Sequence, residues 1–304
     1  MRSHHKFTFS ICAVDRDAGD VGCAVQSKYF SVGSVVPWAK AGVGAVATQA
    51  AGVAVYGQRA LALLEEGVAP DEALARVLAG DAGRETRQLG VVSADGRAAA
   101  HTGSECLTWA GHRVGDGYAV QGNILAGQAV VTEMERAFVE TAGSLAERLV
   151  ASLEAGQAAG GDSRGQQSAA IVVERVGGSQ QSREGIDRVC ELRIEDHPEP
   201  IAELRRLLGI HLVWDAVRRA SLFHAPGRYA EGAALLREAL AGRGEDAVLL
   251  YDLACFESLA GEPEQALAHL TRSVELDHGL RAGAAVDSDF DSIRQDPRFA
   301  TLVS

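Results

Sequence analysis

Three residues of types that bind metals, His101, Cys106 and His112, lie within twelve residues of one another in this sequence. Imidazole and thiolate are the ligands that zinc prefers, so a site built on them would make a metal-dependent enzyme. Their spacing matches no usual structural zinc pattern, and no fourth ligand lies nearby in the sequence. We therefore expect three polar loop residues and no metal or other cofactor. Stoichiometric metal in the purified protein would support the alternative.

Amine chemistry has few candidates in this chain. The sequence holds 29 basic residues, but only Lys6, Lys28 and Lys40 among them are lysines. All three precede residue 41, so any mechanism that needs a lysine must use one of them.

Motifs that identify the common enzyme classes are absent. The sequence has no phosphate-binding loop, no G-x-G-x-x-G after a strand, no H-E-x-x-H and no G-x-S-x-G. The Gly-rich stretch 115–122 does not open a helix after a strand, so we interpret it as a turn that enters a strand. A Ser-His-Asp triad remains an alternative, because its three residues come together in the folded structure rather than in the sequence. No motif indicates which serine would be the nucleophile.

Composition excludes several classes of protein. With 304 residues, of which 47% are hydrophobic, the chain can bury a substantial core and is expected to form about two domains. Its formal charge is −12 and no basic block is present, which argues against binding to nucleic acid.

The same sequence argues against a membrane protein. No run of 18 apolar residues occurs, and the apolar stretch 7–14 is too short for a signal peptide. The five cysteines are dispersed without C-x-x-C spacing, as expected for reduced thiols. We expect a cytoplasmic protein without a membrane partner.

Two thirds of the chain alternates between strands and helices. Strands are predicted at 6–14, 21–26, 41–47, 88–92, 97–101, 118–121, 168–176 and 186–194. Helices are predicted at 53–66, 70–80, 129–141 and 145–155. Because hairpin turns join the strands, we expect an α+β fold with largely antiparallel sheets flanked by helices.

The last third is predicted to be helical and repetitive. Gly227 and Gly261 begin similar segments 34 residues apart, which is the tetratricopeptide period. The earlier segment is the weaker match, because Gly232 stands where alanine is usual. We place the domains at 1–205 and 206–304. Fewer than three repeats cannot bury a continuous face alone, so we expect a protein or peptide partner for them.

Seven separated blocks carry a resemblance to a known family. They read TFSI at 8–11, QSKYFSVG at 26–33, VPWAKAGVGAVATQ at 36–49, WAGH at 109–112, VQGNILAG at 120–127, AGGDSRGQQSA at 159–169 and DHPEP at 196–200. Together they resemble the bacterial domain of unknown function 1028 family, which is placed by fold with the N-terminal-nucleophile hydrolases. The resemblance implies a four-layer αββα sandwich followed by a small all-α tetratricopeptide-like region, and, by analogy of fold, a homo-oligomer.

The resemblance also implies a site. Thr8 matches the residue that becomes the amino-terminal nucleophile, with its own α-amine as base. Seven residues precede Thr8, so the chain would have to cleave itself before Thr8 or begin elsewhere. Lys28 matches the position that would tune the nucleophile, Ser10 is the alternative hydroxyl, and Asn123 with the Gly122 backbone would stabilise an oxyanion. The expected substrate-binding residues are Ser27, Thr48, Gln49, Asp162, Arg164 and Ser168.

Two functions remain as hypotheses. In the first, the chain is an amidohydrolase that cleaves a small amide or peptide bond through Thr8. In the second, the sandwich is a non-catalytic binding or scaffold protein and the repeats recruit a peptide partner.

Overall fold

The computed structural model describes residues 8–178, 186–225 and 227–304. These residues form two compact units, which meet along the chain between Leu208 and Gly209. Residues 1–7, and with them Lys6 and the predicted cleavage segment, lie outside the described residues.

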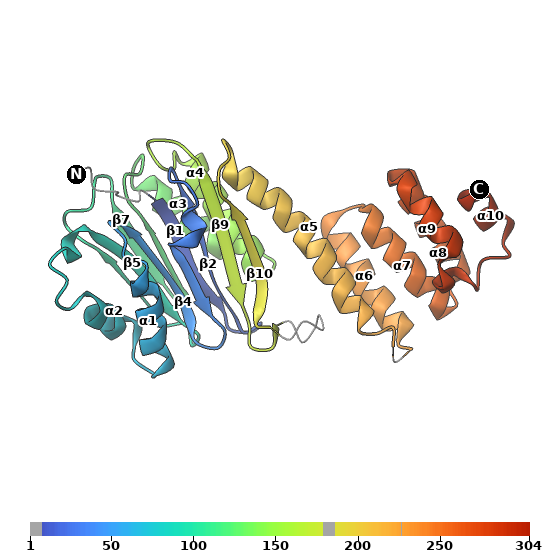
Figure 1. Cartoon of the computed structure of the whole chain (residues 1–304), viewed down its shortest axis with the longest axis horizontal. Coiled ribbons are helices and arrows are strands. Elements are labelled where there is room, and N and C mark those ends of the chain that lie inside the picture. Colours follow the sequence, from blue (N-terminus) through green and yellow to red (C-terminus); the bar gives the residue numbers. More distant parts are fainter. Residues whose placement is uncertain (1–7, 179–185, 226) are drawn as a thin grey trace. The chain divides into compact units, whose positions relative to one another are not determined.

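The first unit contains two sheets whose paired strands are all antiparallel. The larger sheet has the strand order β10-β9-β2-β1-β8-β7 (Figure 1). Its strands are β1 Thr8–Asp15, β2 Asp20–Ser27, β7 Gly111–Gly115, β8 Tyr118–Gly122, β9 Ser168–Glu174 and β10 Arg188–Ile194. The smaller sheet has the order β3-β4-β5-β6, from β3 Pro37–Lys40, β4 Gly44–Ala50, β5 Arg87–Ser93 and β6 Ala98–Thr102.

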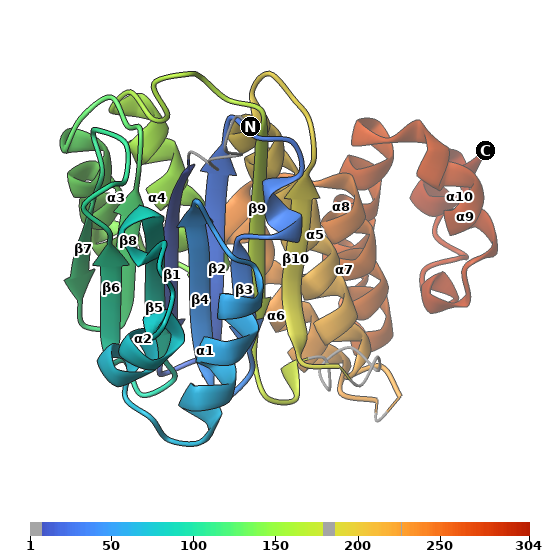
Figure 2. The same cartoon turned by 60° about the vertical axis from the view of Figure 1, so that its left-hand side comes forward.

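The sheets pack face to face, and helices cover their outer faces (Figure 2). Helices α1 Val55–Glu65 and α2 Pro70–Leu78 lie on the smaller sheet. Helices α3 Ala129–Glu140 and α4 Leu145–Ala158 lie on the other side, with α4 against β1, β2 and β9. The core between the sheets uses small side chains, including Cys12, Cys23, Ala45, Ala47 and Ala170. Small residues let the two backbones approach closely at this interface.

Sequence periodicity explains most of these elements. Successive strand residues face opposite sides, so Thr8, Ser10 and Cys12 share the face toward the smaller sheet. Ser144 caps α4 and Glu147 completes a capping box, which fixes where this helix starts. The expected α+β class with antiparallel sheets is confirmed.

Two strands were not predicted. β3 has only four residues and begins with a proline, and β7 has the sequence GHRVG, in which glycines flank two polar residues. Neither has the apolar alternation that identifies a strand. The strand predicted at 41–47 lies three residues later, because residues 41–43 form the turn between β3 and β4.

The second unit is all helical, as expected. Its helices are the later part of α5 Pro200–Ser221, then α6 Tyr229–Arg243, α7 Ala247–Ala260, α8 Pro263–Leu276, α9 Arg281–Val286 and α10 Pro297–Val303. Helix α7 packs against both α6 and α8. The predicted boundary at 205/206 falls inside α5, a continuous helix of 22 residues. In the described parts of the chain, neither α5 nor any other helix is long and apolar enough to span a membrane.

Candidate functional site

Buried polar side chains gather where β1 begins. At this end of the sheets, β1 starts beside the last residues of β2, β4 and β8 and the first residues of β5. The Thr8 hydroxyl donates a hydrogen bond to the Ser27 hydroxyl at 3.2 Å, and both residues are fully buried. A hydroxyl pair thus occupies the first rung of the β1–β2 hairpin.

The next rung continues the polar cluster. The Ser10 hydroxyl donates to the Gln49 carbonyl oxygen at 2.7 Å and accepts from the Gln121 amide nitrogen at 2.7 Å. Ser10 therefore joins β1 to β4 of the smaller sheet and to β8 of its own sheet. All three residues are fully buried, so these bonds form away from water.

Gln88 is the centre of this network. Its carbonyl oxygen accepts from Gln49 at 2.8 Å and from Asn123 at 2.9 Å, and its amide nitrogen lies 2.8 Å from the Gly122 carbonyl oxygen. The same nitrogen lies 3.0 Å from the Thr102 hydroxyl, which contacts His112 Nδ1 at 2.8 Å. Gln88 therefore orders the ends of β4, β6 and β8.

The Thr8 carbonyl is also held firmly. It accepts from the Asn123 backbone amide at 3.0 Å, from Gln49 at 3.3 Å and from the Asn123 side chain at 3.4 Å. The donors of Asn123 that were expected to stabilise an oxyanion are thus engaged with Thr8 and Gln88 in this state.

Other predicted residues lie on the adjoining loops. The Lys28 ammonium donates to the Gln166 carbonyl at 3.0 Å, whereas its backbone amide donates to Asp162 at 3.2 Å. The buried Asp162 carboxylate also pairs with Arg164 at 2.7 Å. Ser168 accepts from the Val32 amide at 3.1 Å. These residues fasten the loops that follow β2 and α4.

Thr48 does not join the cluster. Its hydroxyl donates to the Val53 carbonyl at 3.3 Å, and its cross-strand partner is Leu89, which belongs to the core under α1 and α2. Gln49, the next residue, faces the other sheet. The period of two along a strand therefore separates two residues that were expected to line one cleft.

Backbone strain is concentrated at this end of the sheets. Among the described residues, positive φ at residues other than glycine occurs at Ser31 (56°), Ala50 (63°) and Ile124 (50°). Ala50 follows Gln49 and Ile124 follows Asn123, while Ser31 lies in the loop fastened by Ser168. Left-handed backbone at such residues is costly and is enriched at functional sites.

A buried carboxamide beside the cluster has no protein partner. Gln26 lies on β2 directly across from Phe9, on the face opposite to Ser27. It is fully buried, and neither its amide nitrogen nor its carbonyl oxygen forms a hydrogen bond.

His101, Cys106 and His112, which the sequence offered as metal ligands, each form a hydrogen bond with a different partner. His101 contacts the Arg84 carbonyl at 3.0 Å, and Cys106 donates to the Arg87 carbonyl at 3.3 Å. Burial, with a smaller effect of His101, lowers the pKa of His112. Within the described ranges, no three His, Cys, Asp or Glu side chains are grouped as metal ligands would be.

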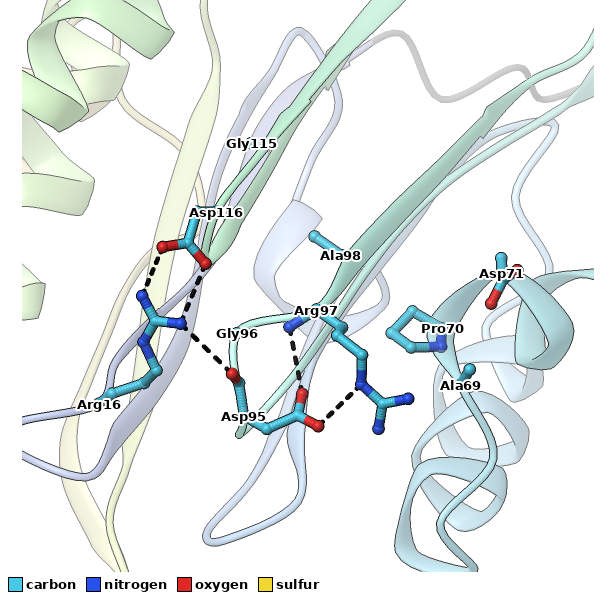
Figure 3. A pocket seen from close by; sticks show the side chains of 10 residues that line it. All are labelled: Arg16, Ala69, Pro70, Asp71, Asp95, Gly96, Arg97, Ala98, Gly115 and Asp116. Atoms are coloured by element: carbon cyan, nitrogen blue, oxygen red, sulfur yellow. Dashed lines mark hydrogen bonds and ion pairs between the residues drawn. The ribbon is translucent and has the colours of Figure 1, made fainter.

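A cavity of about 570 Å³ lies at the opposite ends of the strands (Figure 3). It is lined by Arg16, Ala69, Pro70, Asp71, Asp95, Gly96, Arg97, Ala98, Gly115 and Asp116. Arg16 pairs with Asp116 and Arg97 with Asp95, so its two guanidinium groups are already neutralised. The eight residues of β1, about 25 Å of extended chain, separate this cavity from Thr8.

Sequence reasoning missed Gln88 and Gln121. Each is a single polar residue on the inner face of an otherwise apolar strand, close to the strand end. The sequence shows that pattern, but the pairing of β1 with β8 is needed to bring Gln121 to Ser10, and the packing of the two sheets is needed to bring Gln88 to Asn123.

The fold and site define an α+β protein with two packed antiparallel sheets and a buried hydroxyl and carboxamide cluster at one end. Residues 8–204 match the model of a family described as a family of unknown function, DUF1028, and the chain belongs to this family.

A solved relative agrees with this assignment. The chain is similar to the crystal structure of protein SPO2555 from Silicibacter pomeroyi, also assigned to DUF1028. The sequences are 33% identical, the TM-score is 0.60, and the match covers 66% of this chain and 88% of the other. A comparison with curated proteins gave no match.

Proposed function

We propose that the first unit is an N-terminal-nucleophile amidohydrolase and that its two sheets and four helices form the αββα sandwich of that class. The observation that carries the proposal is the position of Thr8. Its hydroxyl begins β1 and lies 3.2 Å from the Ser27 hydroxyl, in a polar cluster at the end of an apolar core. The substrate class is a small amide or a peptide bond.

The proposed reaction uses only the groups of Thr8 and water. The free α-amine, with an ordinary pKa of about 7.7–8.0, takes the proton of the Thr8 hydroxyl as Oγ1 attacks the substrate carbonyl. The C–N bond breaks, the leaving amine takes the proton, and an ester forms on Oγ1. Water then attacks the ester, releases the acid and restores the hydroxyl.

This mechanism requires a free α-amine on Thr8. We propose that Thr8 Oγ1 attacks the preceding carbonyl, which transfers the acyl group from nitrogen to oxygen and leaves the amine free. Hydrolysis of that ester would release the segment that ends at residue 7. Neither step requires a cofactor.

The neighbouring residues have supporting roles in the proposal. Ser27 orients the Thr8 hydroxyl, and Lys28 would raise the local positive charge that keeps the amine unprotonated. Asn123 and the Gly122 backbone would donate to the oxyanion once substrate displaces their present partners. Ser10 is the alternative nucleophile. Polar contacts to substrate are assigned to Gln49, Asp162, Arg164 and Ser168.

The experiment is the intact mass and amino-terminal sequence of the purified protein. We expect a chain that begins at Thr8 and that loses processing and amide hydrolysis in Thr8→Ala. Ser10→Ala is the matched control, which removes a neighbouring buried hydroxyl and should retain processing. A wild-type chain that keeps the preceding segment would refute this mechanism.

A non-catalytic binding or scaffold protein is the second candidate. It is favoured by the complete burial of Thr8 and by the three donors that its carbonyl already accepts. On this proposal a hydroxyl-reactive β-lactone would leave Thr8 unlabelled in the folded full chain, whereas the hydrolase would be acylated there.

We propose that the second unit is tetratricopeptide-like and binds a peptide or protein partner. The packing of α7 between α6 and α8 supports this, as do the repeated segments 34 residues apart. A homo-oligomeric, cytoplasmic protein is proposed alongside it. Light scattering of the full chain tests the oligomer, and a monomer at micromolar concentration would contradict it.

A further inference from the structure

Two buried thiols face each other on the hairpin that carries Thr8. Cys12 on β1 and Cys23 on β2 are direct cross-strand partners, and their sulfur atoms are 3.5 Å apart. Both side chains are fully buried between the sheets. The proposed hydrolysis uses neither thiol, and all five cysteines are reduced in this structure.

We propose that Cys12 and Cys23 are a modification site, at which a cross-strand disulfide forms within the native fold. Direct partners in an antiparallel pair have Cα atoms about 4.5–5.5 Å apart. Disulfides span Cα separations of about 4.4–6.8 Å. The strands are therefore already at the required distance, and bond formation needs only small rotations of two neighbouring side chains.

Two other cysteines contact oxygen atoms, as Cys12 also does at the Gly90 carbonyl (3.7 Å), but within the described residues neither of these two has a second sulfur as its partner. Cys106 donates to the Arg87 carbonyl at 3.3 Å, and Cys255 lies 3.9 Å from the Asp287 carboxylate in the second unit. The Cys12–Cys23 pair is thus favoured by contact, by strand register and by burial together.

The reaction needs a two-electron oxidant, for which a low-molecular-weight disulfide is sufficient. One thiolate attacks glutathione disulfide, forms a mixed disulfide and releases one glutathione. The second thiolate then attacks the protein sulfur and releases the other glutathione. Burial and the hydrogen bond to Cys23 raise the pKa of Cys12, so exchange proceeds through transient opening of the sheet.

The cross-link would fix the register of the candidate site. Thr8–Ser27, Ser10–Val25 and Cys12–Cys23 are successive pairs on one face of the same hairpin. A bond between Cys12 and Cys23 therefore restrains how β1 can shift along β2. The same restraint fixes the positions of the Thr8 and Ser27 hydroxyls relative to each other.

The experiment equilibrates the full chain with glutathione. The folded protein is incubated in oxidised and reduced glutathione until exchange is complete, then unfolded in guanidinium, alkylated and digested with trypsin. Cleavage after Arg16 separates the two cysteines, so the disulfide appears as linked peptides 8–16 and 17–28 in a chain that begins at Thr8, and as 7–16 and 17–28 in an unprocessed chain. We expect this pair to predominate, with the native circular dichroism spectrum and a Tm several degrees above that of the reduced protein.

Two variants complete the test. Cys12→Ala should lose the linked peptides and the rise in Tm, whereas the matched buried control Cys190→Ala should keep both. Dithiothreitol should reverse the rise in the wild type. The proposal is overturned by five alkylated thiols after equilibration, by pairing of Cys12 with another cysteine, or by a linked protein without the native spectrum.

Discussion

Gln88 and Gln26 are equally buried but differ completely in their hydrogen bonds. The Gln88 side chain bonds to Gln49, Asn123 and the Gly122 carbonyl, whereas the Gln26 side chain forms no hydrogen bond within the described part of the chain. We predict that Gln88→Met lowers the free energy of unfolding by about 2–3 kcal/mol, because it leaves buried amide donors unsatisfied. Gln26→Met should change it by less than about 0.5 kcal/mol or raise it.

Urea denaturation of both variants measures the difference. The two substitutions are identical in chemistry and volume, so each is the control for the other. Equal destabilisation by both would contradict the assignment of Gln88 as the centre of the network.

Asp252 in the second unit gives a pH-dependent prediction. Burial, together with the charges of Asp287 and Asp289, raises its pKa from 3.8 to about 6. The folded state then binds the proton more tightly than the unfolded state. Ionising Asp252 therefore destabilises the folded state. This destabilisation is absent below pH 3.8, grows as pH rises and is complete above about pH 6.

We expect Asp252→Asn to stabilise the second unit by about 1–2 kcal/mol at pH 7.5 and to have little effect near pH 4. Hydrogen exchange of α7 peptides measures this unit alone. Glu238→Gln, an exposed substitution on α6, is the control. A gain that is the same at both pH values would show that charge at Asp252 is not its cause.

Individual residues also show how far the sequence could go. Thr8, Ser10, Gln49 and Asn123 were predicted as site residues, and they do lie together. Thr48 was expected beside them but faces α1, which the strand period alone could have indicated. Gln88 required knowledge of which strands pair and how the two sheets face each other, and no local pattern carries that information.

Among the elements, α6 contains two glycines in opposite environments. A Cβ atom on Gly232 would lie 2.3 Å from the Phe256 ring, whereas one on Gly242 would meet nothing within 4 Å. This close approach explains why the structure requires glycine at position 232.

Alanine substitutions should therefore have opposite signs. Gly232→Ala should cost about 1–3 kcal/mol through overpacking. Gly242→Ala should stabilise by about 0.5–1 kcal/mol through helix propensity. Thermal denaturation compares them, and Phe256→Leu should restore part of the loss in Gly232→Ala. If both alanine substitutions destabilised the protein, the cause would be a general intolerance of α6 to substitution and not the contact of residue 232 with Phe256.

A partly buried ion pair joins the loop after α2 to α1 and to β5 of the smaller sheet. Asp81 accepts from Arg87 at 2.8 Å, from Tyr56 at 2.7 Å and from the Gly83 amide at 2.8 Å. The Arg87, Tyr56 and Gly83 bonds hold the pKa of Asp81 well below its usual value. Its stabilisation is therefore present above pH 3.8 and is lost as pH falls further.

We predict that Asp81→Asn lowers the free energy of unfolding by about 2 kcal/mol at pH 7. The difference from wild type should shrink when denaturation is measured at decreasing pH below 4. Asp71→Asn, on the exposed side of α2, is the control. If the difference in unfolding free energy between Asp81→Asn and wild type did not depend on pH, the charge of the Asp81 carboxylate would not be the source of the stabilisation.

Elements with strong periodicity were predictable and weak ones were not. Helices α1 to α4 have apolar faces at helical spacing, and most of the longer strands alternate. β3 and β7 are short pieces that become strands by pairing with β4 and β8. Their structure comes from tertiary hydrogen bonds rather than from their own residues.

At the scale of the molecule, the chain should be divisible after Leu208. Ile201, Leu204 and Leu208 of α5 are buried, and all three belong to the first unit. We predict that a chain of residues 1–208 keeps the circular dichroism signal of the sheets. A chain of residues 1–199 should be less stable by about 3 kcal/mol or more, because it loses those apolar side chains.

Equal stability of the two truncated chains would show that α5 contributes nothing to the first unit. The sequence predicted a domain boundary at 205/206, because strand patterns end before Pro198 and Pro200. That boundary falls within α5, which is continuous from Pro200 to Ser221.

The order of strands in the larger sheet also determines when the site can form during synthesis. Ser27 at the end of β2 pairs with Ser168 at the start of β9, and β10 then closes that edge of the sheet. The β1–β2 hairpin is local, but its edge at β2 stays unpaired on the ribosome until β9 and β10 have emerged, when almost 200 residues have been made, because contacts this distant along the chain form late. The helices of the second unit contact near neighbours and can fold as they appear. Any cleavage before Thr8 should accordingly be a post-translational event, absent from nascent chains that end before β9.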